Sequence, residues 1–369
     1  MQSTVLHISK YPPYRGGMDK VLRLHAATSN ARLLHLLRPV TVNHQAPGPS
    51  IYAPMGWVGR QLAAVPAAAA PRVSCYYNCW GADVFSSADR AKVRVGYLHN
   101  FFPEFTRYVR HYAPFLDGFL TVSRPMAEAV QRAVGPEWRG NIGLVHYPVE
   151  KYFIPAAAPA SGCVIGWCGR LARAQKRVDR LPDLLARLDE TKLDYRLELL
   201  GDGPDRDWLA ARIGPHPRVI FHGWIEHDKL VRVMQSWHYL VSCSDYEGQS
   251  IALLEAIATG CVPLYPDFHS GAELPPRTAR ACLYPPGDLA TLIARLLALE
   301  AAPAEAAAVR AELANLSELH RPERYLTDFT AWSNAVQPVA RRRPAAPLGC
   351  LVAPVWVYNR FYKRLTHVG

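Results

Sequence analysis

Long apolar runs are absent from this sequence of 369 residues. No stretch approaches the roughly 18 consecutive apolar residues that a membrane-spanning helix needs. The first residues, MQSTVLHISKYPP, have no charged segment followed by a long apolar one, so we expect a β-strand there and no signal peptide. The sequence therefore argues against a protein that crosses a membrane.

Paired cysteines are also absent. The eight cysteines are scattered, none lies three positions from another in a Cys-x-x-Cys pattern, and no His/Cys cluster has zinc-binding spacing. This excludes a disulfide scaffold, and we expect small buried thiols in a reducing cytosol. A recognisable nucleic-acid module is missing as well, so the high isoelectric point of about 9.3 does not predict a nucleic-acid partner.

The positive charge is unevenly distributed along the chain. Residues 1–150 contain 16 Lys or Arg and 8 Asp or Glu, whereas residues 151–337 contain 20 and 23. Residues 338–369 contain six basic residues and no acidic one. The first part and the tail are therefore expected to face something anionic.

Half of the residues are hydrophobic, which allows a sizeable core, and the length favours two domains. In both halves, short apolar segments alternate with amphipathic ones, a pattern typical of parallel strands covered by helices on both faces. We expect two doubly wound α/β domains that face each other across a cleft, with ligands at the carboxyl ends of the strands. The Pro/Ala-rich segment Ile154–Gly162 marks the boundary. The Ala-rich segment 297–316 is predicted to be helical surface structure.

The segment SDYEGQSIALLEAIATGCVPLY, Ser244–Tyr265, is the most informative part of the chain. A strand precedes it, and a helix is expected to begin near Ser250 and to end at Gly260. Glu247 would lie in the loop at the carboxyl edge of the sheet, beside a helix start that can bind anions. Glu255 would lie among apolar neighbours and need a polar partner such as a sugar hydroxyl. An ordinary capped helix with one exposed glutamate is the alternative.

A second loop follows the strand at 163–167 and contains Arg170 and Lys176 in the sequence GWCGRLARAQKRVDR. An arginine and a lysine after a strand can clamp a diphosphate, the arginine through two parallel hydrogen bonds and the lysine as a point charge. The alternative is a solvated basic loop.

Together these motifs resemble glycosyltransferase family 4, whose members are retaining enzymes with the GT-B fold of two Rossmann-like domains. The resemblance is strongest over residues 163–265, where the Gly-Arg-Leu loop, the LLGDGP turn, the VIFHGW strand end and the two glutamates occur in the family's order. It implies an N-terminal acceptor domain at 1–155, a nucleotide-sugar domain at 156–320, a helix at 321–337 that returns toward the first domain, and a basic aromatic tail at 338–369.

The resemblance also implies roles for individual residues. Glu247 would contact the transferred sugar, and His99, which ends the strand KVRVGYLH, would line the sugar site; these are the candidate catalytic residues. Glu255 would bind the donor ribose. The donor diphosphate would be bound by Arg170, Lys176, Gly16 and Gly17. The donor sugar would also meet Gly248, Gln249, Ser250 and Ile251. Gln249 and Ser250 stand where the family often has an aromatic residue and a glycine, and Arg177 where it often has glycine.

A possible metal signal occurs in Asp205-Arg206-Asp207, which has the Asp-x-Asp spacing of metal-dependent glycosyltransferases. These residues open a helix, where acidic side chains suit the positive end of the helix dipole, and we favour that capping interpretation. We therefore expect no metal and no other cofactor. The isolated histidines His7, His146 and His222 are expected to be structural.

The sequence thus predicts a hexosyltransferase that moves a sugar from a nucleoside diphosphate donor to a hydroxyl of a glycolipid or lipid-linked saccharide, as in the biosynthesis of bacterial lipopolysaccharide or exopolysaccharide. The expected location is the cytoplasm, on the inner face of the cytoplasmic membrane. Two alternatives remain: a nucleotide-sugar epimerase of the same fold, and a non-catalytic binding subunit that resembles a transferase.

The tail can be interpreted in two ways. Its six cations are interleaved with Trp356, Tyr358, Phe361 and Tyr362, a composition that suits the headgroup region of an anionic membrane. The other interpretation is a segment that packs back on the fold with its cations solvated. We favour the membrane, because the first domain has the same sign of charge.

Overall fold

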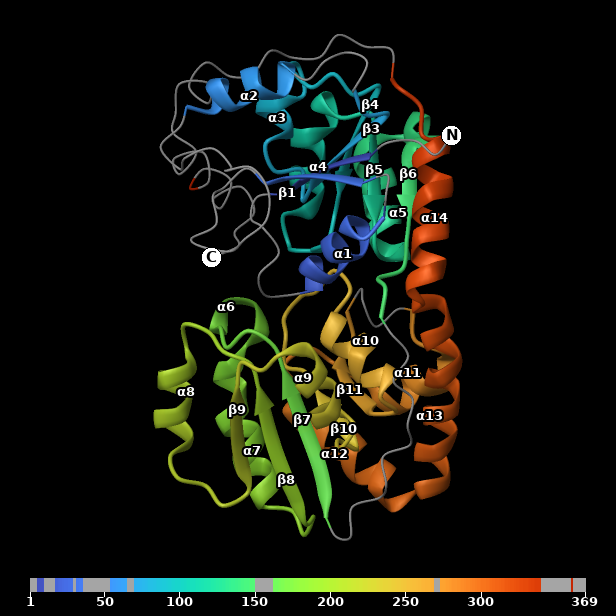
Figure 1. Ribbon diagram of the computed structural model, residues 1–369. Helices are drawn as coiled ribbons and strands as arrows, with labels where there is room; N and C mark the ends of the chain where they lie inside the picture. The colour runs from blue at the N-terminus through green and yellow to red at the C-terminus, as the bar shows by residue number, and fades with distance from the viewer. Residues whose placement is uncertain are drawn as a thin grey trace. The chain divides into compact units, whose positions relative to one another are not determined.

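The computed structural model describes residues 5–9, 17–28, 31–35, 54–64, 70–149, 162–268, 273–339 and 360. The chain forms two compact units (Figure 1). Unit 1 contains residues 1–148 and 325–369, and unit 2 contains residues 149–324. The boundary predicted after residue 155 and nearly all of the basic tail lie outside the described residues.

Unit 1 is built on a parallel six-stranded sheet in the order β2-β1-β3-β4-β5-β6. Its strands are β1 (Val5–Ser9), β2 (Ala31–His35), β3 (Val73–Tyr77), β4 (Val93–Tyr97), β5 (Gly118–Thr121) and β6 (Ile142–Leu144). Its helices are α1 (Gly17–Ala26), α2 (Met55–Ala63), α3 (Ala82–Phe85), α4 (Phe105–Tyr112), α5 (Arg124–Val134) and α14 (Pro322–Ala335), which starts in unit 2.

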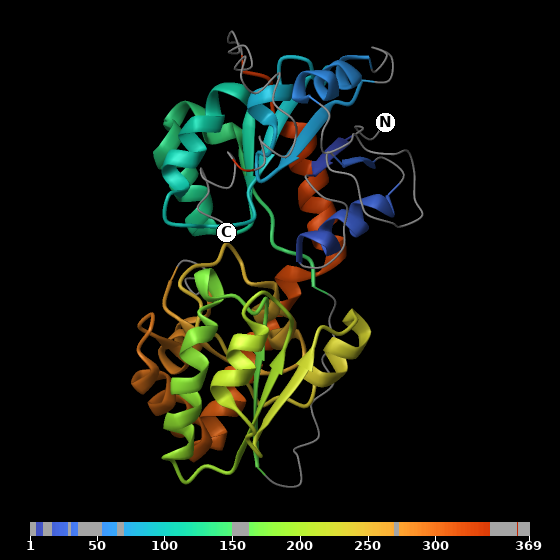
Figure 2. The same ribbon diagram turned by 90° about the vertical axis from the view of Figure 1, so that its left-hand side faces the viewer.

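Unit 2 repeats this plan with the sheet order β12-β11-β10-β7-β8-β9, again with parallel pairing throughout. Its strands are β7 (Cys163–Cys168), β8 (Tyr195–Leu200), β9 (Val219–Gly223), β10 (Tyr239–Val241), β11 (Val262–Pro266) and β12 (Leu283–Tyr284). Its helices are α6 (Arg173–Lys176), α7 (Leu181–Asp189), α8 (Arg206–Ile213), α9 (His227–Met234), α10 (Ile251–Ala258), α11 (Pro276–Cys282), α12 (Leu289–Ala301) and α13 (Pro303–Ser317). Figure 2 shows these helices on both faces of the sheet. The prediction of two doubly wound α/β units is therefore confirmed.

The strand order of unit 2 indicates where on its sheet a ligand would be expected to bind. The chain proceeds from β7 outward to β9 and then returns to β10, which pairs with β7 on the other side. In open sheets of this kind, the loops after the two strands at such a reversal diverge and leave a crevice at the carboxyl edge. The two loops that contain the predicted diphosphate and sugar residues follow β7 and β10.

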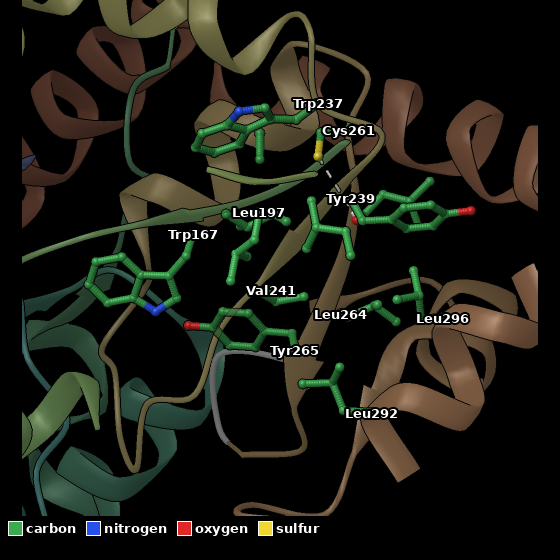
Figure 3. Close-up of a cluster of buried hydrophobic side chains, with 14 of the residues drawn as sticks. Trp167, Leu197, Trp237, Tyr239, Val241, Cys261, Leu264, Tyr265, Leu292 and Leu296 are labelled. Atoms are coloured by element: carbon green, nitrogen blue, oxygen red, sulfur yellow. Dashed lines mark hydrogen bonds between the residues drawn. The ribbon is translucent and has the colours of Figure 1, made fainter. Parts of the chain in front are cut away.

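The core of unit 2 holds that edge rigid. Buried side chains from β7, β8 and β11 pack with those of α12 and with Trp237, which precedes β10; they include Trp167, Leu197, Leu264 and Leu292 (Figure 3). Gly166 in β7 is required by this packing, because a Cβ atom there would lie 2.0 Å from the ring of Trp237. Such a contact is far inside van der Waals distance, so only glycine fits.

The prediction for the Ala-rich segment 297–316 was partly wrong. It is helical, but Pro303 begins a new helix at a break between α12 and α13. One side of these helices is also buried in the core rather than exposed, through Leu299, Ala306, Val309 and Leu313. Alanine is small enough to allow close helix packing, which composition alone does not distinguish from a solvated surface.

Unit 1 contains a buried cluster of histidine and tyrosine side chains that α14 completes. His7 Nδ1 lies 3.0 Å from the Tyr77 hydroxyl, and His25 Nε2 lies 2.7 Å from the Tyr325 hydroxyl of α14. Phe329, also of α14, has its ring centroid 4.3 Å from that of His25. Burial lowers the pKa of His25 and of His99 to about 3, and it lowers the pKa of His7 well below the usual value. These three histidines are therefore neutral in the folded chain.

We predict that acidification weakens this unit in a window set by the histidines. Their pKa values are lower in the folded chain than in the unfolded chain, where they are about 6.5, so the unfolded state takes up protons first as the pH falls. Each histidine should cost up to about 2 kcal/mol of unfolding free energy between pH 7 and pH 5. Urea-unfolding midpoints across this range would measure the loss.

The matched variant for this prediction is His25→Gln, which keeps a polar group near Tyr325 and cannot titrate. Its stability should fall less steeply between pH 7 and pH 5 than that of the parent chain. An identical slope for the two proteins would show that His25 does not contribute.

Candidate active site

Glu247 lies at the centre of a hydrogen-bonded group at the carboxyl edge of the unit 2 sheet. Lys176 Nζ is 2.6 Å from its Oε1 atom, and the Ser244 hydroxyl donates to the same oxygen at 3.0 Å. Gln175 Nε2 donates to the other oxygen, Oε2, at 3.2 Å. The side chains of Lys176 and Glu247 are 18% and 9% exposed, so solvent screens their attraction only partly. The prediction that Glu247 lies in a loop after β10 is confirmed.

Arg170 has a different environment from Lys176, although the sequence placed them in one clamp. Its side chain is exposed, and it forms no ion pair with the described residues. Lys176 is instead engaged with Glu247. The loop therefore offers one cation that is available at once and one that is already shared with a carboxylate.

The backbone of this loop is fixed by the turn after β8. Gly169 donates its N–H to the carbonyl of Leu200, and Leu171 donates to that of Asp202. Gly201 has a φ of +139°, and a Cβ atom on it would lie 1.8 Å from the Gly169 carbonyl oxygen. The LLGDGP turn thus packs against the backbone of the Arg170 loop, and this close approach requires glycine at position 201.

Helix α10 begins at the same edge. Ser250 is its N-cap and accepts a hydrogen bond from the Leu253 N–H at 3.3 Å, which confirms the predicted helix start. Gly248 and Ile251 flank this cap, and the first N–H groups of a helix have no acceptor within it. The Gln249 amide donates to Glu273 at 3.1 Å, so its side chain is already engaged. Glu255 lies on α10 and is only 4% exposed, as its apolar neighbours predicted.

The prediction that Asp205 and Asp207 lie at a helix start is confirmed. Asp205 is the N-cap residue of α8, but its side chain makes no cap hydrogen bond. Its two oxygens instead receive the Arg173 backbone N–H at 2.7 Å and the Arg173 Nε at 2.8 Å. Asp207 lies in the first turn of α8, as expected. Among the described residues, no group of three or more His, Cys, Asp or Glu side chains is arranged to hold a metal ion.

His99 belongs to unit 1, where it follows β4, and it is only 9% exposed. Its backbone N–H donates to Asn78 Oδ1 at 2.9 Å, and its Nδ1 contacts the Tyr147 hydroxyl. The ring stacks on Tyr77 with centroids 5.0 Å apart. Its Nε2 atom has no hydrogen-bond partner within the described part of the chain. His99 is therefore held firmly with one ring nitrogen unoccupied.

The other predicted residues are less informative. Gly17 is the first residue of α1, and Gly16 lies outside the described residues. His7 is structural, as expected, and His222 pairs with the buried Glu198 at 3.0 Å, an interaction shared with the indole N–H of Trp237.

Sequence reasoning missed the residues that connect the two loops. Gln175 donates to Glu247 and, at 3.1 Å, to the Tyr246 carbonyl, while its own carbonyl accepts from the Asp245 N–H at 3.0 Å. Arg177 and Arg180 both form ion pairs with Asp245. These contacts join positions about 70 apart in the chain, which no local pattern reveals.

Comparison with known proteins agrees with this arrangement. Residues 162–301 match the family model "Glycosyl transferases group 1". This match covers most of unit 2, including every loop of the candidate site in that unit.

Two curated proteins are similar to part of the chain. The lipopolysaccharide 1,6-galactosyltransferase of Escherichia coli K12 is 29% identical over 165 residues, which is 42% of this chain and 45% of that protein. The 2-deoxystreptamine N-acetyl-D-glucosaminyltransferase of Streptomyces fradiae is 29% identical over 131 residues, 34% of this chain and 31% of that protein. The chain thus spans less than half the length of the curated relatives it matches.

Solved structures show that the likeness in fold extends over nearly the whole chain. The lipopolysaccharide outer core galactosyltransferase WaaB in its apo form has a TM-score of 0.66 at 19% identity, over 89% of this chain and 98% of that one. Anabaena Alr3699/HepE in complex with UDP has a TM-score of 0.72 at 15% identity, with the same coverage. The two Rossmann-like units therefore have the GT-B fold.

We predict that the two loop cations differ in their effect on stability. Lys176→Ala should lower the free energy of unfolding by about 2 kcal/mol, because it leaves the buried Glu247 carboxylate without its charged partner. Arg170→Ala should change it by less than about 0.5 kcal/mol, because that side chain is exposed and has no ion-pair partner in the part of the chain that the structure describes. Urea unfolding would measure both. Equal losses in the two variants would contradict the assignment.

Proposed function

We propose that this protein is a retaining hexosyltransferase that transfers a sugar from a nucleoside diphosphate sugar to a hydroxyl group of an acceptor. The observation that carries the proposal is the fixed Glu247 carboxylate, held beside Lys176 at the reversal point of the unit 2 sheet, with an exposed Arg170 nearby that forms no ion pair with a described residue. The partial matches to glycosyltransferases support it.

The donor diphosphate would be bound by positive groups at this edge. Arg170 is free to form two parallel hydrogen bonds with phosphate oxygens, and the first N–H groups of α10, beyond Gly248, add their partial positive charge. Lys176 can turn from Glu247 toward a phosphate oxygen or bridge the two anions. These groups stabilise the charge that builds on the diphosphate as its bond to the sugar breaks.

The sugar would be held on the carboxylate side of the site. The bond between the anomeric carbon and the diphosphate oxygen breaks, and the acceptor oxygen bonds to the same face of that carbon. The acceptor proton passes to the departing phosphate oxygen. Ser244 and Gln175 still hold Glu247 when Lys176 turns to the diphosphate, so Glu247 stabilises the positive charge of the sugar without forming a covalent bond.

The nucleotide would be bound through Glu255, whose carboxylate we assign to the ribose hydroxyls. A uridine nucleotide is the first donor to test, because the structure of Alr3699/HepE has been determined with UDP and with UDP-glucose. The proposal requires no metal ion, because Arg170 and Lys176 supply the positive charge and Asp205 is engaged by Arg173.

The proposal predicts that the donor stabilises the chain. In a panel of UDP and GDP sugars, the donor should raise the melting temperature, since a ligand at 100 times its Kd adds about 2.7 kcal/mol of stability.

The proposal also predicts separate effects for the two glutamates. Glu247→Gln should lower kcat by about 100-fold with little effect on nucleotide affinity. Glu255→Gln should weaken nucleotide binding by about tenfold, measured by calorimetry.

Three results would contradict parts of this scheme. Weaker nucleotide binding in Glu247→Gln alone would reverse the two roles. Conversion of the donor to an epimer without an acceptor would identify an epimerase, and binding without turnover a binding subunit. Loss of activity in EDTA that manganese restores would show that a metal is needed.

We further propose a glycolipid or lipid-linked saccharide as the acceptor, met in the cytoplasm at the inner face of the cytoplasmic membrane. The similarity to a lipopolysaccharide galactosyltransferase supports this choice. The basic balance of residues 1–150 and 338–369 suits an anionic surface. No helix in the described part of the chain is long and apolar enough to cross a membrane.

The basic tail is predicted to contribute to membrane binding. A chain that ends after Val339 keeps the hydrogen bond of the Val339 N–H to Asp117, 3.0 Å long, and removes all six tail cations. It should bind vesicles with phosphatidylglycerol more weakly than the full chain, most clearly at low salt, and bind UDP equally well. Vesicle co-sedimentation would measure this. Equal binding by the two chains would assign the tail a structural role.

A further inference from the structure

Arg177, next to Lys176, has an unusual backbone conformation. Its φ is 47° and its ψ is 48°, in the left-handed region that residues with a side chain rarely adopt. Asn78, Cys79 and Arg177 are the non-glycine residues with positive φ among those described. Glycine would adopt this conformation without strain. An arginine in this place therefore needs a compensating interaction.

The compensation is a set of ion pairs across the two loops of the site. The Arg177 guanidinium contacts Asp179 through Nε at 3.0 Å and Nη2 at 2.8 Å. Its Nη1 atom donates to Asp245 Oδ2 at 2.9 Å. The other oxygen of Asp245 is 2.8 Å from Arg180 Nη1, which also donates to the Cys243 carbonyl. Asp245, two positions before Glu247, is thus held between two arginines.

The left-handed conformation of Arg177 lets two consecutive side chains contact the same loop at two different residues. Lys176 reaches Glu247, while Arg177 reaches Asp245. These contacts are not equivalent in the reaction, because Lys176 must be shared with the donor diphosphate. When the lysine turns to phosphate, the loop loses that contact and depends on the contacts that remain, those of Gln175, Arg180 and Arg177. The Arg177 contact remains in place.

We propose that Arg177 is a positioning residue that keeps the Glu247 loop in place when Lys176 engages the donor. This inference rests on the proposed function. This role explains why an arginine occupies a backbone conformation suited to glycine. The backbone strain is offset by the ion pairs of Arg177, which lie outside the proposed diphosphate site. The hydrogen bonds of Arg177 lower the pKa of Asp179, so that this carboxylate is ionised near neutral pH.

Three substitutions separate the charge from the backbone conformation. Arg177→Gly removes the cation and relieves the strain. Arg177→Asn removes the cation, while asparagine tolerates the left-handed region. Arg177→Lys keeps a cation that can reach Asp245. The matched control is Arg218→Asn, which removes an arginine paired with Asp189 at the opposite end of the strands.

The first measurement is hydrogen exchange of the peptide covering residues 242–250 without ligand, in a Lys176→Ala parent from which the lysine contact is already absent; it does not depend on activity. Exchange should be at least about fivefold faster in Arg177→Gly and Arg177→Asn, close to the parent rate in Arg177→Lys, and unchanged in Arg218→Asn. Unchanged exchange in both the Gly and Asn variants would overturn the inference. This holds whether or not the protein proves to be a transferase.

The second measurement is turnover with UDP affinity on the same variants. Arg177→Gly and Arg177→Asn should lower kcat by about ten- to hundredfold and leave the Kd for UDP within about threefold, with partial recovery in Arg177→Lys. Arg177→Gly with the parent kcat would overturn the inference, whereas a parent chain that turns over no nucleotide sugar would overturn the proposed function. If Arg177→Gly fails to fold, Arg177→Lys and Asp245→Asn test the same contact.

Discussion

The ammonium group of Lys176 and the carboxylate of Glu247 lie 2.6 Å apart and join the two loops that form the candidate site. One loop follows β7 and the other follows β10, and the pair is possible only because these strands are neighbours in the sheet. With both groups largely shielded from water, their attraction is stronger than that of a surface pair. The proposed phosphate and sugar sites are therefore electrically coupled before any donor binds, and a charge change at one is felt at the other.

This coupling also shows what a sequence can and cannot reveal. Strand and helix positions in unit 2 followed from apolar periodicity and from stops such as Gly214 and Gly260. Glu247 and Ser250 were placed correctly by the helix start that follows them. The strand order was not available from these patterns. Partners 71 positions apart, such as Lys176 and Glu247, become neighbours through that order, so the contact of Lys176 with Glu247 was not part of the prediction for the diphosphate clamp.

Unit 1 illustrates the same limit for buried polar residues. The strand before His99 was predicted from the sequence, and the resemblance implied a role for His99. The side chains that fix it, Asn78 and Tyr147, come from other strand ends, and nothing in their local sequence distinguishes them. Asp205 shows the same limit. Its position at a helix start was predicted, but the hydrogen bonds that its carboxylate accepts from the backbone N–H and the Nε of Arg173 were not.

The placement of Tyr325 and Phe329 in unit 1 has a consequence for how the chain is made. Their rings close a cluster whose other members, such as His7 and His25, are near the beginning of the sequence. During synthesis, the first unit emerges early but lacks the helix that covers these groups until about 300 further residues have been added. Unit 2 is continuous in sequence and ends at Arg324, so all its residues emerge before Tyr325 and Phe329 do. The order of completion on the ribosome should thus be the reverse of the order in the sequence, with the earliest residues among the last to be sealed from water.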